Sequence, residues 1–352
     1  MSKEKATVLD FIKSPLLRYL AVRFLLIIPT VFILVSMVFF VMRAIGDPIT
    51  AALGGRLTPT ELHRRIHLAG YDRPVIVQYF EFLGQVARGD FGRTLSTRQT
   101  IGELLATYGM ATVELTVYAV IIALIVGIPL GMWAAKFRDT AKDASARLFA
   151  ILAYATPVFF VGLLLKLVFG VAFPILPIAG RAGVSNELLL QSVPGASGFF
   201  LIDALRTGDP QLILDVVRHA VLPAVALGLL TAGIFLRLVR TNMIGTLNTD
   251  YVDAARSRGV SELRLTTKHA YRPALIPVIT VIGMQIAVLL SGAVLTETTF
   301  EWKGLGFELA NFLNARDFVA VQGIVTLLAV IVAVTNFLVD VIAAIIDPRI
   351  KF

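Results

Sequence analysis

The sequence predicts an all-α membrane protein with six transmembrane helices, on the strength of its composition and the length of its apolar runs. The 352-residue chain is 57% hydrophobic and only 16% charged, whereas soluble globular domains carry about a quarter charged residues. Its charge-free runs reach the length of a membrane span, because a helix of about 20 apolar residues crosses the roughly 30 Å hydrocarbon core of a bilayer. A large soluble protein with an extended core is therefore excluded.

Six charge-free runs are the predicted spans. Four of them have 19 to 24 residues and lie at residues 24–42, 115–135, 273–296 and 318–339. The remaining two are shorter and lie at 148–165 and 220–236. The basic side chains that bound these two runs can extend toward the membrane surface. The first run is longer than the hydrophobic region of a cleaved signal peptide, so we expect it to remain as a helix.

The distribution of charge predicts the orientation of the spans. Lysine and arginine gather in alternate segments, with five in residues 1–23, four in 136–147 and seven in 237–272. Cytoplasmic loops of membrane proteins carry such an excess of basic residues. Both termini and the 237–272 loop are therefore expected in the cytoplasm.

The predicted organisation is a cytoplasmic segment, 1–23, followed by one membrane domain, 24–352. Two external insertions interrupt this domain at about 43–110 and 174–219. The first insertion holds eight arginines, which is unusual for an external segment, but six acidic residues offset them. It is also longer than the loops to which the charge rule applies.

Three helices are predicted inside these insertions. Thr58 and Pro59 form a helix start, an N-cap residue followed by proline in the first turn, and this helix runs to about residue 68. The others are expected at 75–87 and 210–218. The chain has no cysteine, so it forms neither a disulfide framework nor a thiolate metal site.

Enzymatic and metal sites have little support in the sequence. His63 and His67 are four residues apart, as zinc ligands often are, but Arg64 and Arg65 stand where a metalloprotease motif needs glutamate. A solvated helix face is the expected interpretation. The chain has no P-loop and no Gly-x-Ser-x-Gly nucleophile elbow. We therefore expect no catalytic residue, no metal and no cofactor on this chain.

Ionisable and polar side chains at membrane depth are costly and often functional. Lys166 and Asp340 are the main candidates, and for both we favour snorkelling or one structural ion pair over a proton relay. Gln285 is an amide in the middle of a span, which either bonds to a neighbouring helix or lines a polar path. Gly127 and Gly131 indicate close packing between helices.

The most polar long run, residues 251–277, predicts a short helix between two spans. Residues 248–250 supply N-cap oxygens for it, and Gly259 can take the left-handed conformation that stops it. Ala254 and Ala255 leave a smooth patch that another surface can approach closely.

Two interpretations of this short helix stay open on physical grounds. It is either a basic interfacial loop that holds anionic lipid, at about 1 kcal/mol per charge, or a docking element that a soluble partner grips. A second helix is expected after it, capped by Ser261 and running toward Arg272.

Residues 253–259, Asp-Ala-Ala-x-x-x-Gly, resemble the Glu-Ala-Ala-x-x-x-Gly loop of membrane subunits of binding-protein-dependent ATP-binding-cassette importers. Other motifs are similar to those of the peptide/nickel branch, the dipeptide and oligopeptide permeases, and they occur in the family's order. They are Gly46-Asp47-Pro48, Tyr71-Asp72-Arg73-Pro74, Arg88-Gly89-Asp90-Phe91-Gly92, residues 155–162, Glu297-Thr298-Thr299-Phe300, Gly304-Leu305-Gly306, Arg316-Asp317 and Asp347-Pro348-Arg349. Asp253 departs from the general glutamate, and Lys303 and Val319 stand where the branch often has proline.

The resemblance implies the type I permease fold of these importers and a subunit that forms the path for peptides, or for related solutes such as nickel chelates. The membrane would be a bacterial-type inner membrane. The implied partners are a second related permease, two ATPases that bind ATP and magnesium, an external substrate-binding protein and lipid, but no nucleic acid. A stand-alone secondary transporter or channel is the alternative.

We expect three groups of site residues in such a subunit. The ATPase-coupling group is Tyr251, Asp253, Ala254, Ala255, Arg256, Arg258 and Gly259. The translocation-path group is Pro157, Phe159, Gln285 and Ser291. The external gate and binding-protein contact group is Asp72, Arg88, Asp90, Glu297, Trp302, Arg316 and Asp317.

Overall fold

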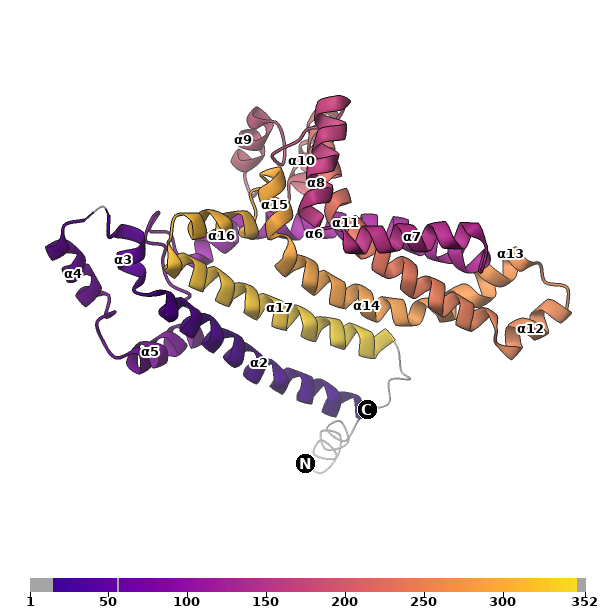
Figure 1. Cartoon of the computed structure of the whole chain (residues 1–352), viewed down its shortest axis with the longest axis horizontal. Helices are drawn as coiled ribbons and strands as arrows, with labels where there is room; N and C mark the ends of the chain where they lie inside the picture. The colour runs from indigo at the N-terminus through magenta and orange to yellow at the C-terminus, as the bar shows by residue number, and fades with distance from the viewer. Residues whose placement is uncertain (1–14, 56, 347–352) are drawn as a thin grey trace, which may run out of the picture. The chain divides into compact units, whose positions relative to one another are not determined.

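The computed structural model describes residues 15–55 and 57–346, and over these ranges the chain is helical without a named strand. It divides into two compact units. Unit 1 joins the chain up to Gly109 with the chain from Glu308 onward, and unit 2 is Met110–Phe307. Figure 1 traces the helices along the chain. The terminal motif at 347–349 lies outside the described residues.

The helices that contribute to unit 1 are α2 (Pro15–Ile45), α3 (Pro48–Leu53), α4 (Pro59–Leu68), α5 (Val75–Ala87), the start of α6 (Ile101–Lys136), the end of α16 (Leu305–Asn314) and α17 (Phe318–Ile346). The long helices α2 and α17 pack side by side, as Figure 1 shows. An ion pair of 3.3 Å between Arg23 and Asp340 joins them. The first and sixth predicted spans lie inside these two helices.

The short helices of the first insertion follow the turn signals in the sequence. Thr58 is the N-cap of α4, and its hydroxyl accepts a hydrogen bond from the Glu61 amide. The predicted helix at 75–87 is α5. The far end of the insertion is different from the prediction, because α6 already begins at Ile101 rather than near residue 115. No proline or charge cluster separates the two positions, so the helix extends beyond the charge-free run.

Unit 2 contains the rest of α6 and most of the remaining helices. These are α7 (Ala141–Ala155), α8 (Val158–Lys166), the π-helix η1 (Leu167–Ala172), α9 (Val184–Ser192), α10 (Phe200–Thr207), α11 (Pro210–Leu247), α12 (Asp250–Ser257), α13 (Glu262–Arg264), the π-helix η2 (Leu265–Ala270), α14 (Tyr271–Gly292) and α15 (Val294–Phe300).

Helices α6 and α11 approach each other backbone to backbone. A Cβ atom added at Gly127 would lie 2.8 Å from the carbonyl oxygen of Ala232, and one added at Gly131 would lie 2.8 Å from that of Leu236. Real Cβ atoms do not tolerate such distances, so only glycine fits. The predicted close packing at this pair of glycines is confirmed.

The third predicted span is not one straight helix. Helices α7 and α8 meet at an angle of 101° across Thr156 and Pro157. Proline has no amide proton and forces the preceding residue out of the helical region, and Thr156 is extended, with φ −81° and ψ 127°. Four described helices are long and apolar enough to cross a membrane, and six spans result if each of two bent helix pairs counts as one.

The predicted boundary near residue 219 is also wrong. The helix expected at 210–218 and the span expected at 220–236 form a single helix, α11, which continues to Leu247. Asp209 caps its start by accepting a hydrogen bond from the Gln211 amide. His219 marked a boundary only as a polar side chain, and a polar side chain alone does not stop a helix.

Candidate functional site

The short helix α12 lies between two long helices of unit 2 and is anchored by one side chain. Val252 is fully buried, whereas the neighbouring Tyr251 is 47% exposed. The predicted capping oxygens at 248–250 do not bond to its first amides. Thr249 is the N-cap residue, but its hydroxyl donates to the Thr246 carbonyl at 2.6 Å instead.

The end of α12 is a Schellman motif. The Gly259 amide donates to the Arg256 carbonyl at 2.9 Å, and the Val260 amide donates to the Ala255 carbonyl at 3.3 Å. Gly259 has a φ of +79°, the left-handed conformation that this motif requires. The predicted helix stop is therefore confirmed in its geometry.

The remaining predicted coupling residues face away from the core. Asp253, Ala254, Arg256, Arg258 and Gly259 are exposed, and Ala255 is half-buried. The residues that the pattern brings together therefore form one accessible surface around the end of a short helix.

Arg256 connects the two sides of the turn that follows α12. Its guanidinium bonds to Asp253 one turn earlier and to Glu262 beyond the turn, the latter at 2.7 Å. Ser261 is the N-cap residue of the following helix, as predicted, but its side chain makes no cap hydrogen bond. The helix expected after Ser261 is a single turn, α13, that continues through the π-helix η2 into α14.

The four predicted path residues are divided between the α7–α8 bend and α14. Pro157 and Phe159 are exposed at the bend between α7 and α8. Gln285 is half-buried on α14. Ser291 belongs to the same helix, but its side chain lies outside the described part of the structure.

Glu297 and Trp302 hold a turn inside unit 2. The Glu297 carboxylate accepts hydrogen bonds from the Thr112 hydroxyl at 2.7 Å and from the Phe307 amide at 2.9 Å. The Trp302 indole donates to the Ala111 carbonyl at 2.8 Å. Both side chains are fully buried. This corrects the expectation that they contact an external protein directly, since neither is accessible; a part in gating remains a prediction.

The glycines of the Gly-Leu-Gly motif make room for that carboxylate. A Cβ atom at Gly304 would lie 2.5 Å from both oxygens of Glu297, and one at Gly306 would lie 2.7 Å from the Val294 Cα atom. The two motifs, separate in the sequence, therefore form one packed unit.

Glu297 makes the stability of the protein depend on pH. Burial raises its pKa from 4.5 to about 7, although the hydrogen bond from Thr112 opposes this. A carboxyl with a raised folded pKa stabilises the fold fully below its unfolded value, and this contribution is lost as the pH rises through 7. The difference corresponds to about 3 kcal/mol, at about 1.4 kcal/mol per pH unit. The thermal unfolding midpoint in detergent should therefore be lower at pH 8 than at pH 5.

Glu297→Gln is the matched variant for this prediction, because glutamine keeps the shape and does not titrate. We expect its midpoint to change much less between pH 5 and pH 8. A wild-type midpoint that rises over this interval, or a variant with the wild-type slope, would contradict the assignment.

The other predicted external residues belong to unit 1. Asp72, Arg88 and Asp90 are exposed. The Asp72 carboxylate lies 2.6 Å from the His67 ring, and this hydrogen bond lowers the pKa of Asp72. No group of three or more His, Asp or Glu residues that could hold a metal ion occurs in the described part of the chain.

Asp317 and Arg316, adjacent in the sequence, have opposite environments. Arg316 is exposed, whereas Asp317 is fully buried. The Asp317 carboxylate accepts hydrogen bonds from the Leu95 and Ser96 amides at 2.7 and 2.9 Å, and it also accepts one from the Ala320 amide at the start of α17. Asp317 therefore fixes the loop before α6, and direct contact with a partner is not open to it.

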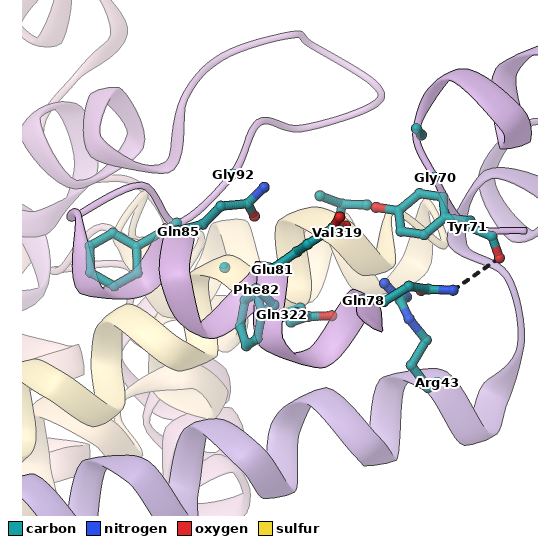
Figure 2. A pocket seen from close by; sticks show the side chains of 13 residues that line it. Arg43, Gly70, Tyr71, Gln78, Glu81, Phe82, Gln85, Gly92, Val319 and Gln322 are labelled. Carbon is teal, nitrogen blue, oxygen red and sulfur yellow. Dashed lines mark hydrogen bonds between the residues drawn. The ribbon is translucent and has the colours of Figure 1, made fainter. Parts of the chain in front are cut away.

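A small cavity of about 100 Å³ lies within unit 1, next to the Tyr71 motif (Figure 2). The Arg43 guanidinium stacks on Phe39 and Tyr71, at 5.0 and 4.6 Å from the ring centres. The Gln78 amide donates to the Tyr71 and Arg73 carbonyls at 3.1 and 2.8 Å. These contacts fix the connection between α4 and α5, which gives the motif a structural role.

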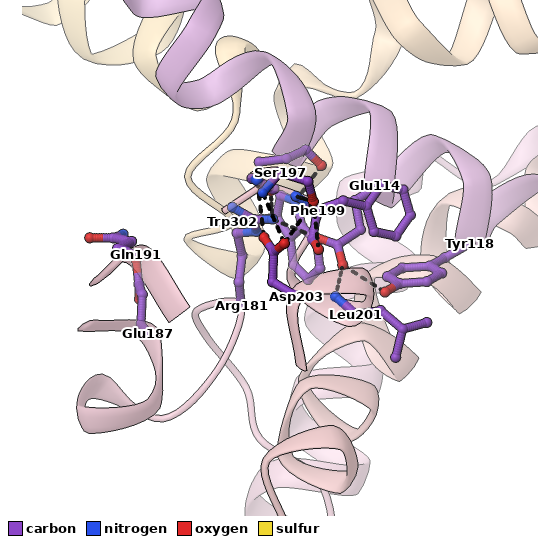
Figure 3. Close-up of polar contacts among 12 residues, drawn as sticks. Glu114, Tyr118, Arg181, Glu187, Gln191, Ser197, Phe199, Leu201, Asp203 and Trp302 are labelled. Carbon is purple, nitrogen blue, oxygen red and sulfur yellow. Dashed lines mark hydrogen bonds and ion pairs between the residues drawn. The ribbon is translucent and has the colours of Figure 1, made fainter. Parts of the chain in front are cut away.

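A buried ion pair holds the second insertion in unit 2, and sequence reasoning missed it. Figure 3 shows Arg181 beside Glu114, both almost fully buried. Glu114 also accepts hydrogen bonds from the Tyr118 hydroxyl at 2.7 Å and the Leu201 amide at 3.0 Å. The signal was an acid at the border of a charge-free run, but its partner is 67 residues away.

Lys166 and Asp340 each have a partner of their own. The Lys166 amino group donates to the Thr299 carbonyl at 2.8 Å, within unit 2. Asp340 pairs with Arg23 in unit 1. Each therefore has a structural contact, as we favoured over a proton relay.

Comparisons with known proteins cover nearly the whole chain. The family model described as binding-protein-dependent transport system inner membrane component matches residues 127–352, and the model of the N-terminal membrane component of the same systems matches 16–101. The chain is 37% identical over 338 residues to the di/tripeptide transport system permease protein DppB of Pseudomonas aeruginosa, covering 96% of this chain and 99% of that one. It is 36% identical over 338 residues to the dipeptide transport system permease protein DppB of Escherichia coli K12, with the same coverage. It is 34% identical over 305 residues to the probable D,D-dipeptide transport system permease protein DdpB of Escherichia coli K12, covering 87% and 88% of the two chains.

Proposed function

The chain belongs to the family of binding-protein-dependent transport system inner membrane components, and from this premise we propose how it couples transport to a motor. It is the multi-pass membrane subunit of a binding-protein-dependent peptide importer, with the all-α fold of ABC importer permeases. Such a system includes an ATPase and a substrate-binding protein. The single observation that supports the coupling proposal is the accessible end of α12, closed by Gly259.

The proposal assigns ATP hydrolysis to other subunits and the transmission of force to this one. The α12 surface docks on an ATPase, and movement of that ATPase shifts α12 together with α11 and α14. The Ala254 and Ala255 side chains allow close approach because they project little. Arg256, Arg258 and Asp253 supply charges at the rim of the contact, where they favour correct docking more than affinity.

The proposed assembly contains a second, related permease, two ATPases and one external binding protein. This chain binds no cofactor, and ATP and magnesium belong to the ATPases. The excess of lysine and arginine in alternate segments supports the proposal that α12 and both termini lie on the ATPase side, in the cytoplasm. Peptides are the proposed cargo, with related solutes such as nickel chelates as the second choice. The lining of the path by Pro157, Phe159, Gln285 and Ser291 remains a proposal.

Reconstitution in proteoliposomes tests this function. The complete set of subunits should import a labelled dipeptide in the presence of ATP and loaded binding protein, and the chain alone should import none. ATP-independent import by the purified chain alone would instead support a secondary transporter or channel.

Gln285 provides a test of the path that does not involve the docking surface. Gln285→Leu should lower the rate of import about fivefold, because the polar path loses an amide whose hydrogen bond to cargo contributes about 1 kcal/mol. A cysteine at this position should react with a polar thiol reagent during turnover. Normal import by the leucine variant, together with an unreactive cysteine, would remove Gln285 from the path.

A further inference from the structure

The face shared by α7 and α11 carries a cavity to which the sequence motifs contribute only Ala155, the first residue of the motif at 155–162. It has a volume of about 540 Å³ and lies entirely within unit 2. Arginines and apolar side chains line it together, among them Arg147, Ile151, Tyr154, Leu236, Arg237 and Arg240. We propose that this cavity binds an anionic phospholipid, with the phosphate between the arginines and the acyl chain along α7.

The cavity has more positive than negative charge. Asp143 is fully buried, and Arg240 bonds to both of its carboxylate oxygens at 2.5 and 2.6 Å. Arg147 lies 3.6 Å from the same carboxylate. Arg237 makes no ion pair within the described residues, and its guanidinium lies 5.5 Å from the centre of the Tyr154 ring. Two guanidinium groups thus share the Asp143 carboxylate. Asp139 is a further acid near Arg240 but pairs with Arg138. Arg237 remains without an acidic partner among the described residues, and an anion in the cavity balances this excess.

The site is also partly preformed. Because Asp143 binds Arg240 through two parallel hydrogen bonds, the Arg240 guanidinium is fixed in one plane. Its side chain is only 19% exposed. The Arg240 guanidinium is therefore already ordered before an anion binds. Binding to it costs less conformational entropy than binding to a mobile side chain.

The rest of the wall is apolar and faces outward. Ile151 is 62% exposed and Tyr154 is 55% exposed. Helices α7 and α8 together have the length and composition of a broken membrane span, so these side chains meet hydrocarbon rather than water. An inorganic anion would satisfy only the arginines. A phospholipid matches both the charged end and the apolar wall.

The position along the helices fits a lipid headgroup. Arg147 is in the second turn of α7, and Arg240 is two turns before the end of α11. Basic pockets between helices at such a membrane border are suited to anionic headgroups. The observations favour this occupant over a second protein subunit, because a protein contact would have to bury the unpaired charge of Arg237 against a matching acid.

Native mass spectrometry of the delipidated protein, as the full-length chain alone and in its assembled importer, tests the proposal. Phosphatidylglycerol should bind about tenfold more tightly than phosphatidylcholine with the same acyl chains. Arg237→Gln should weaken phosphatidylglycerol binding about fivefold, and adding Arg147→Gln should weaken it further. Arg138→Gln is the matched control, since this exposed arginine precedes α7 and pairs with Asp139, and its affinity should stay at the wild-type value.

Four results would overturn the proposal. Equal affinity for the two lipids would remove the headgroup from the interaction, and wild-type affinity in Arg237→Gln would place the lipid elsewhere. Displacement of the lipid by an equal concentration of glycerol 1-phosphate would indicate a site for free anions. Binding to the chain alone that disappears in the assembled importer would show that another subunit covers this face.

Discussion

Replacing Gly259 by leucine should lower ATP hydrolysis stimulated by loaded binding protein about 5- to 30-fold, without changing membrane insertion. Gly259 has a φ of +79°, and this left-handed conformation costs a residue with a side chain roughly 1–2 kcal/mol. The native end of α12 is then populated about 5 to 30 times less. A Cβ atom at this position would meet no neighbour within 4 Å, so the effect comes from the backbone and not from a clash.

Gly245→Leu is the matched control for this experiment. Gly245 is exposed on α11 near α12, has no positive φ, and also has open space for a side chain. It should retain wild-type coupling.

Ala255→Arg tests the same docking surface in another way, because a long side chain prevents close approach; it should also uncouple hydrolysis from transport. Wild-type stimulation in both Gly259→Leu and Ala255→Arg would refute docking at α12.

Replacing Glu114 by alanine should destabilise the protein by about 3–5 kcal/mol, the cost of leaving a buried charge without its partner. Arg181 is 4% exposed and would lose its only ion-pair partner within the described residues. The Leu201 amide and the Tyr118 hydroxyl would lose their acceptor as well. Thermal unfolding in detergent, followed by the exposure of buried tryptophan, measures the change.

The double variant Glu114→Leu with Arg181→Met separates the ion pair from simple packing. An apolar pair of similar volume removes both charges, so most of the lost stability should return. If the double variant is as unstable as Glu114→Ala, the hydrogen bonds to the insertion matter more than the charges. If Glu114→Ala unfolds at the wild-type midpoint, the pair is not buried in the protein in solution.

The sequence predicted best those elements that local chemistry decides. Helix α5 has the predicted bounds because Pro74 precedes it and Gly89 follows it, with φ +78°. Gly259 was identified because a glycine after a short helix commonly takes the left-handed conformation that ends it. Gly127 and Gly131 were identified because glycines four residues apart in a membrane helix commonly mark close helix packing. The family itself was recognisable because many short motifs occur in one order.

Helix boundaries within continuous apolar sequence were less predictable. The polar side chain of His219 and the charge of Glu114 suggested ends that the helices α11 and α6 do not have. The bend at Pro157 could be expected from proline, but its angle of 101° depends on packing against other helices. No local rule contains that information.

The burial of the predicted gate residues could not be predicted from the sequence either. Glu297, Trp302 and Asp317 look like surface residues in a motif because two of them are acidic and all lie in a short polar segment. Each of them bonds to at least one residue that is 185 to 222 residues away in the chain. Burial therefore depends on tertiary contacts that spacing does not reveal.

The close packing of α11 against α6 has a mechanical consequence. After Pro223, α11 runs 24 residues to Leu247, about 36 Å at 1.5 Å per residue, and only Asn248 and Thr249 separate it from α12. The backbones approach closely at Gly127 and Gly131, so no side chain of α6 separates the two helices at these positions. A force applied to α12 is therefore transmitted to α11 and α6 as one rigid pair of helices. The bending that a conformational change requires must then occur elsewhere, at the α7–α8 connection at Pro157 and in the π-helix before α14.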